Sequence, residues 1–298
     1  MTVSLNTIET SLFNKHVFAQ GLQHVTVEQG SDASITPESE EEVKARAQSA
    51  LDKTEILFTD EDARETKHLK TVLFTKAVDS QRLLTSEGEI IYLEGLFIPE
   101  NEDNDIKTQQ FIEEHYLDKD IDLYICKESK CKSTDRYGHL RVHAVTQKDK
   151  TWLQAALLTT GHAQLRTRSD WPALITRMQR IESTARIEKI GLWLIPDLSI
   201  MDALKITDEQ RGFHLVEGRV HSVAMHKNIV YLNFGDNWRE DFTVVVPSTM
   251  RRVFAKNGID IMGKGGEILR VRGWIDSYNG PFIEIDHAEQ IEWIKTAN

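Results

Sequence analysis

The chain has 298 residues, of which 40% are hydrophobic, and this is enough for two domains with cores of their own. The formal net charge of -11 excludes attraction of the whole molecule to phosphate backbones, so nucleic-acid binding would need a local patch. No run approaches the roughly 18 apolar residues of a membrane span, and the first residues lack the pattern of a signal peptide. We therefore expect a soluble, cytoplasmic protein without membrane contact, or a periplasmic or secreted one if a leader has been removed.

Residues 1–70 are predicted to form an N-terminal extension. Residues 31–42 are polar and acidic, and acidic residues in a first turn favour a helix that continues through Val43, Ala47 and Leu51. The apolar stripe of this helix is thin, which is typical of a solvated linker helix. Docking of the helix to a partner is the alternative.

A β-rich stretch begins the first predicted domain, residues 71–195. Pro99 cannot donate to a ladder and ends the third strand, so Glu100 follows in a loop. Two helices with apolar stripes are predicted at the end of this domain. The strands are predicted over 72–78, 82–85, 89–98, 121–126 and 140–145, and the helices over 106–117, over 151–160 and from Pro172 to Gly191. Three strands, a helix and two strands follow the order of a five-stranded OB barrel.

The same order of elements returns in a second predicted domain, residues 212–298, after a short linker. Strands are predicted over 214–224, 228–234, 242–246, 267–276 and 281–285, with a helix over 247–256. The predicted fold class is therefore mainly β with α, built from two OB-like barrels. The first barrel carries two C-terminal helices.

Two cysteines, Cys126 and Cys131, lie on either side of a charged four-residue loop. They are too few for a zinc site. Two free thiols are the simpler interpretation. A small disulfide-closed loop is the alternative, in an oxidising compartment.

Four stretches of the first domain resemble, in order and spacing, the staphylococcal nuclease (thermonuclease) family. They are Ala77-Val78-Asp79, Leu96 to Glu100, Asp135 to Gly138, and Glu188 to Trp193. The resemblance implies an OB barrel and calcium-dependent hydrolysis of phosphodiesters. In active members two aspartates help to hold Ca²⁺, two arginines bind phosphate and a glutamate activates water.

The chain departs from this family at most of the positions that carry the chemistry. Glu100 matches the glutamate, and Asp79 matches the first aspartate of the family's turn. Gln81 and Phe97 stand where the calcium carboxylates are expected, and Tyr92 and His139 stand where the arginines are expected. An amide and a phenyl ring cannot replace the charge that Ca²⁺ requires. We therefore predict a degenerate, non-catalytic domain that needs no cofactor.

A divergent metal-dependent phosphodiesterase is the alternative. Arg141 lies two residues beyond His139 and hence on the same strand face. With Glu100 these two side chains would form a rearranged catalytic cluster, and Asp79 would be a ligand of Ca²⁺.

The second domain carries a candidate binding surface of aromatic and basic residues. Tyr231 and Trp238 lie on or after its second strand. Arg270, Arg272 and Trp274 are two residues apart on a later strand and so share one of its faces. OB folds bind single strands by combining aromatic platforms with a basic groove. The expected partner is therefore a protein or single-stranded nucleic acid, with ordinary strand packing as the alternative role of these aromatics. The oligomeric state is not predicted.

Overall fold

A computed structural model describes residues 45, 49, 56–99, 102–129, 131–168 and 170–294, without the side chains of Glu102 and Asp197. All of them belong to the compact unit Ser39–Asn298. Within these ranges no helix is both long and apolar enough to cross a bilayer. Glu100 lies outside the described residues, and so does the helix predicted over 43–51, except for Ala45 and Ser49, which are helical.

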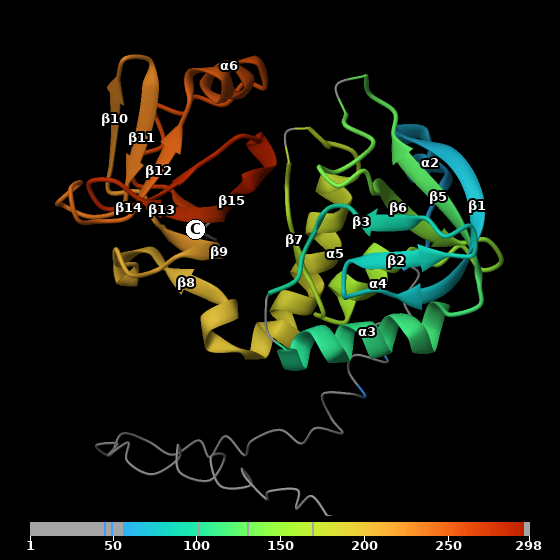
Figure 1. The fold of residues 1–298 in the computed structure, drawn as a ribbon. Coiled ribbons are helices and arrows are strands. Elements are labelled where there is room, and N and C mark those ends of the chain that lie inside the picture. Colours follow the sequence, from blue (N-terminus) through green and yellow to red (C-terminus); the bar gives the residue numbers. More distant parts are fainter. Residues whose placement is uncertain are drawn as a thin grey trace, which may run out of the picture. The chain divides into compact units, whose positions relative to one another are not determined.

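Five strands close a barrel in the order β1-β2-β3-β6-β5 (Figure 1). The strand β3 runs parallel to β6, and the other pairs are antiparallel. The strands are β1 (Thr66–Ala77), β2 (Arg82–Thr85), β3 (Ile90–Leu93), β5 (Asp120–Cys126) and β6 (Leu140–Thr146). Because successive side chains point to opposite faces of these strands, Leu83, Ile91 and Val142 point into one core. The predicted five-stranded barrel is confirmed.

The third predicted strand is broken at Gly95, which differs from the single strand expected over 89–98. Gly95 has a φ of 83°, a conformation that favours glycine, and a Cβ atom there would lie 2.8 Å from the Cε atom of Met178. Beyond this turn β4 (Leu96–Phe97) leaves the barrel and pairs with β7 (Gln164–Leu165). The break therefore moves Phe97 away from the barrel wall.

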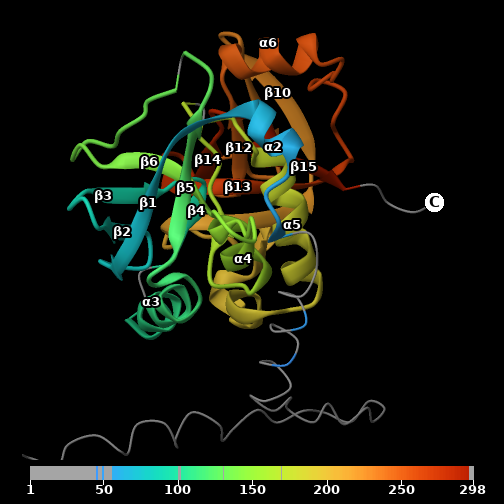
Figure 2. The ribbon, with the colours of Figure 1, turned by 90° about the vertical axis from the view of Figure 1, so that its right-hand side faces the viewer.

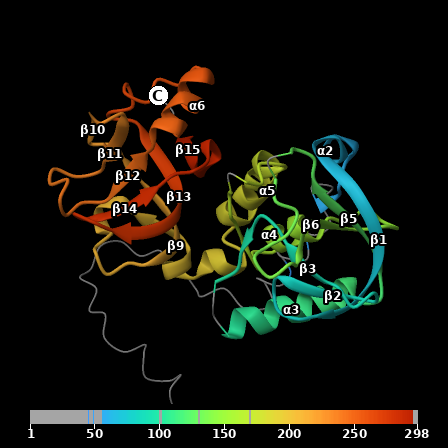
Figure 3. The same cartoon turned by 45° about the horizontal axis from the view of Figure 1, so that its top comes forward.

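Four helices accompany the barrel over the described residues. They are α2 (Asp60–Glu65), α3 (Glu102–Tyr116), α4 (Leu153–Thr159) and α5 (Ile175–Ile187). Every residue of α4 is buried, and α5 buries Met178, Ile181 and Ala185, as its apolar stripe predicts. The helix α3 contacts β1, and α4 lies beside α5 (Figure 3).

An eight-stranded sheet follows, with the order β10-β11-β12-β14-β13-β9-β8 and β15 paired to β13. Its helix α6 (Ser248–Lys256) lies beside strands β10 to β12 (Figure 2). The strands are β8 (Ile200–Asp202), β9 (Gly212–Arg219), β10 (Ser222–His226), β11 (Ile229–Asn233), β12 (Thr243–Val246), β13 (Ile268–Ser277), β14 (Pro281–Glu284) and β15 (Ile291–Ile294).

The strand predicted over 214–224 is divided into β9 and β10, and β15 follows the last predicted strand, so the predicted order of three strands, a helix and two strands is only partly confirmed. A second closed barrel is not confirmed, because over the described residues the strands of this sheet follow an open order. The predicted linker also contains structure, because β8 pairs in parallel with β9 and short 3₁₀ helices lie over 191–194, 196–198 and 203–205. The domain boundaries at 195 and 212 stay a prediction.

The two cysteines form a disulfide between Cys126, at the end of β5, and Cys131. The interpretation as two free thiols is therefore wrong. The Cα atoms lie 6.0 Å apart, because the loop turns back after β5 toward the start of β6. This bond closes the short charged loop that precedes the Asp135 to Gly138 stretch.

Candidate functional site

In the turn before β2, the carboxylate of Asp79 accepts hydrogen bonds from residues of the same turn. One carboxylate oxygen of Asp79 accepts hydrogen bonds from the amides of Gln81 (2.9 Å) and Arg82 (2.7 Å). The other accepts from Nε of Arg82 at 2.6 Å. The side chain of Gln81 donates to the carbonyl of Leu96 at 2.8 Å. Asp79 thus shapes a turn, and the amide of Gln81 ties this turn to β4.

Aromatic side chains occupy two positions where the family places charge. The ring of Phe97 packs against Phe213 of β9, with 4.6 Å between ring centroids, and meets the edge of Trp274 of β13 at 5.9 Å. On β3, burial raises the pKa of Tyr92, which keeps its hydroxyl neutral. Phe97, which the resemblance sets at a calcium position, is therefore part of an aromatic contact between the barrel region and the eight-stranded sheet.

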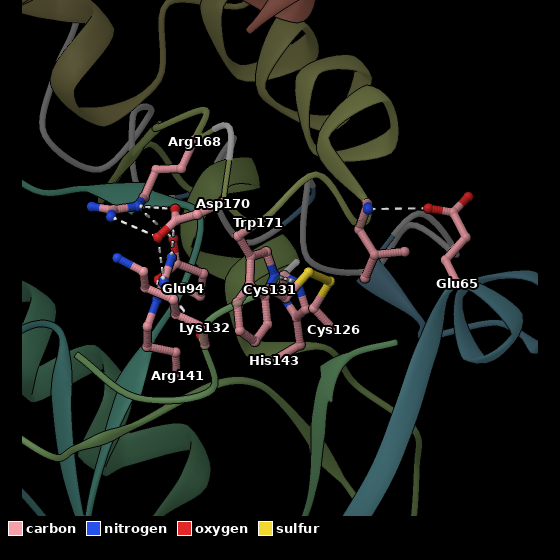
Figure 4. Close-up of a disulfide and its surroundings, with 11 residues drawn as sticks. Glu65, Glu94, Cys126, Cys131, Lys132, Arg141, His143, Arg168, Asp170 and Trp171 are labelled. Atoms are coloured by element: carbon pink, nitrogen blue, oxygen red, sulfur yellow. Dashed lines mark hydrogen bonds and ion pairs between the residues drawn. A yellow bond between two sulfur atoms is a disulfide. The ribbon is translucent and has the colours of Figure 1, made fainter. Parts of the chain in front are cut away.

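Arg141 of β6 is 3% exposed and lies in a network of ion pairs (Figure 4). Its Nε donates to Glu94 at 2.7 Å, and its Nη1 donates to Asp170 at 3.0 Å. Its guanidinium also lies 5.1 Å from the ring centroid of Trp171. Burial by itself would raise the pKa of Asp170, but hydrogen bonds and charge from Arg168 and Arg141 lower it well below its usual range.

His139 has a different carboxylate partner, Asp135. The two side chains meet at 3.0 Å, and Asp135 also accepts the amides of Tyr137 and His139. Burial works against ionisation of Asp135, yet these hydrogen bonds lower its pKa. The structure therefore does not join His139 and Arg141 through a shared partner. The catalytic cluster with Glu100 stays a prediction.

Sequence reasoning missed Asp170 and His143, which support the Arg141 network. Nε1 of Trp171 donates to Nε2 of His143 at 3.3 Å, and burial lowers the pKa of His143 to about 3. The imidazole is thus neutral and accepts this hydrogen bond. In the sequence, the feature that points to Asp170 is the basic residue Arg168 two positions before it. The sequence alone does not show that Asp170 lies near Glu94, which follows β3, and Arg141 of β6.

The described residues do not fit a calcium ion at the expected positions. Ca²⁺ takes six to eight oxygen ligands, usually several of them carboxylates. Among the residues with described positions, no group of three or more His, Cys, Asp or Glu side chains is placed to hold a metal. The amide of Gln81 and the ring of Phe97 face other protein groups, as above.

Arg270 and Arg272, predicted to bind phosphate, pair with carboxylates. Arg272 is 1% exposed and donates to Glu182 of α5 at 2.7 Å and to Glu292 of β15 at 2.6 Å. Arg270 donates to Glu292 at 3.2 Å and to Glu217. Burial opposes ionisation of Glu292, yet the charges of Arg272 and Arg186 lower its pKa to about 2. This face of β13 therefore packs against α5, and Trp274 continues it toward Phe97.

Tyr231 and Trp238 lie elsewhere, in a groove with a volume of about 620 Å³. The groove covers the face of β11, β12 and β14 and is also lined by Tyr278, Phe282 and Glu284. The structure thus separates the five predicted binding residues into two groups. Tyr231 and Trp238 share an open groove, whereas Arg272 and Trp274 contact the barrel region and Arg270 pairs beside them with Glu217 and Glu292.

A comparison with protein families matches residues 91–194 to the staphylococcal nuclease homologue family. The match begins at β3, so the Asp79 turn lies outside it, and it ends just after Trp193. A comparison with curated proteins finds no match. The resemblance inferred from the four stretches is confirmed for this part of the chain.

Proposed function

We propose that this chain, whose residues 91–194 match the staphylococcal nuclease homologue family, is a non-catalytic interaction protein. The observation that carries the proposal is the position of Phe97, whose ring packs against Phe213 and Trp274. A phenyl ring has no oxygen to offer a cation, and this ring is held by its packing partners. Gln81 and Arg141 are likewise engaged with protein partners.

The loss of rate expected from the missing charged residues supports the same conclusion. Loss of one group aimed at a developing charge commonly costs about 3 to 4 kcal/mol, or 100- to 1000-fold in rate. At the positions where the resemblance places them, this chain lacks two family arginines and two calcium carboxylates. Even with strong non-additivity, such a site retains little rate enhancement.

A nuclease assay tests the proposal. The full chain is incubated with end-labelled single-stranded DNA and with Ca²⁺, Mg²⁺ or Mn²⁺ in turn, and we expect no cleavage above the protein-free control. The divergent phosphodiesterase is the rival function, with Glu100, His139 and Arg141 as its catalytic residues and Asp79 as metal ligand. Metal-dependent cleavage that disappears in both Glu100→Gln and Arg141→Ala would establish the rival instead.

The interaction itself is proposed to use the groove that contains Tyr231 and Trp238, with a protein or single-stranded nucleic acid as partner. Exposed aromatic rings on a sheet face suit either class. Fluorescence titration with oligo(dT) at low salt tests the nucleic-acid alternative, with Trp238→Ala as the variant. No affinity, or an affinity that this substitution leaves unchanged, removes nucleic acid from the proposal.

The Cys126–Cys131 disulfide supports an oxidising compartment over the cytoplasm, because structural disulfides persist mainly outside reducing compartments. Quantification of free thiols in the native protein, trapped by alkylation at the moment of cell lysis, tests this placement. Two alkylated cysteines in the trapped protein would favour the cytoplasm.

A further inference from the structure

The groove is the outer face of the second region's sheet. Ile229 and Tyr231 of β11 alternate with the buried residues Val230 and Leu232, so they point away from the core. On β14, Phe282 and Glu284 lie on either side of the buried Ile283 in sequence, so they also point away from the core. The floor of the groove is therefore apolar and aromatic, with one carboxylate at Glu284.

Two aromatic side chains flank this floor from loops. Trp238, in the loop between β11 and β12, is 53% exposed, and Tyr278, in the turn between β13 and β14, is 81% exposed. Both line the groove. Large aromatic rings that stay this exposed at the edges of a concave apolar surface are typical of a binding site.

The charge around the groove is acidic. Glu284 lies within it, and the flanking segments carry Asp236, Glu240, Asp241 and Asp276 against Lys227 and Arg239. A strand of phosphates in the groove would meet the carboxylate of Glu284, and the excess of carboxylates in the flanking segments also opposes binding of nucleic acid. A lysine or arginine side chain would instead gain both a carboxylate and aromatic ring faces.

We propose that the groove binds an extended peptide segment of a protein partner, with apolar side chains on the floor and a lysine or arginine beside Glu284. The inference rests on the proposed interaction function and specifies its partner. The volume of about 620 Å³ suits a few side chains of a peptide rather than the surface of a folded domain. Tyr231 and Phe282 contact the apolar side chains, while Trp238 and Tyr278 enclose the segment from its two sides.

A selection with a library of random ten-residue peptides on the immobilised full chain tests the proposal. We expect the enriched peptides to combine apolar residues with at least one lysine or arginine. Fluorescence anisotropy with one such labelled peptide should show at least about ten-fold weaker binding for Tyr231→Ala and for Trp238→Ala. Glu284→Gln should weaken the same peptide by about five-fold or more and remove the preference for a basic residue.

The matched control is Tyr137→Ala, which removes an exposed tyrosine from a loop of the barrel region and should leave peptide affinity unchanged. Near-ultraviolet circular dichroism verifies that each variant is folded. The proposal is overturned if no peptide is enriched, if the enriched peptides are acidic, or if their affinity survives both aromatic substitutions. Binding of oligo(dT) that is lost in Trp238→Ala would assign the groove to nucleic acid. Cleavage in the separate nuclease assay would contradict the non-catalytic function of the barrel without changing the peptide result.

Discussion

The nuclease-like side of the barrel and the outer face of the eight-stranded sheet differ in how their side chains are used. On the barrel, Arg141 is enclosed by Glu94 and Asp170, and Phe97 is covered by Phe213. On the sheet, Trp238 and Tyr278 are largely exposed around a groove. The difference indicates that these side chains of the barrel take part in the protein's internal packing, whereas the second sheet offers an open surface.

Arg272→Met should have the largest effect on this arrangement, because it removes a buried cation that joins α5 to the sheet. The substitution leaves the buried Glu182 and the partly buried Glu292 with Arg186 as their remaining shared cation, and breaking a buried pair typically costs about 3 to 5 kcal/mol. Urea unfolding at pH 7 measures the change in the free energy of unfolding.

Arg270→Met is the matched control for this experiment, since Arg270 lies on the same strand face but is more exposed. We expect a smaller loss for it. Equal losses of less than about 1 kcal/mol for both variants would contradict a structural role for the buried Arg272 pair.

Replacement of both cysteines by serine should destabilise the protein by about 2 kcal/mol, the chain-entropy value for a loop this short. The effect is smaller than that of Arg272→Met because the disulfide constrains only a few residues of the unfolded chain. Chemical unfolding of the oxidised wild type and the double variant measures it. Titration of two free thiols in the denatured, unreduced protein would contradict the bond.

Acidification should destabilise the protein through His143, whose buried imidazole has a pKa of about 3 in the fold and 6.5 as its ordinary value. Because the unfolded chain binds this proton more readily, the free energy of unfolding falls as the pH drops below 6.5. Between pH 7 and pH 5 we expect a loss of about 1 to 2 kcal/mol from this group.

His143→Gln keeps an acceptor for Trp171 but does not titrate, so its stability should depend less on pH. Urea unfolding of both proteins at pH 7 and pH 5 gives the comparison. The same loss of stability in wild type and variant would show that His143 does not contribute to the acid sensitivity.

Tyr278→Ala should have the smallest effect, within about 0.5 kcal/mol, because an exposed aromatic side chain contributes little to stability. Phe97→Ala, which truncates an aromatic ring that is packed on both Phe213 and Trp274, should cost more, about 1 to 2 kcal/mol. Thermal unfolding of both variants measures the difference. A larger loss for Tyr278→Ala would mean that the rim of the groove is part of the packing and is not free for a partner.

Much of the fold followed from local patterns in the sequence. The alternation around Leu83 and Ile91, and the stripe of Met178 and Ile181 on α5, predict strands and a helix, because the side-chain period is set by each element alone. The same reasoning missed the turn at Gly95, where a φ of 83° favours glycine and Met178 of a distant helix packs against the turn. The short strands β8 and β15 were missed as well, since they depend on partners far along the chain.

The order of strands in the barrel and the resemblance of residues 91–194 to the staphylococcal nuclease homologue family could be inferred from the sequence, because both depend on residue identity at fixed spacing. Which charged groups are paired became visible only in the folded arrangement. Arg270 and Arg272 alternate along a strand like phosphate-binding residues, yet α5 and β15 bring Glu182 and Glu292 to them from distant segments. Tyr231 and Trp238 meet Tyr278 and Phe282 for the same reason, since neighbours in a folded sheet come from strands that are far apart in the chain.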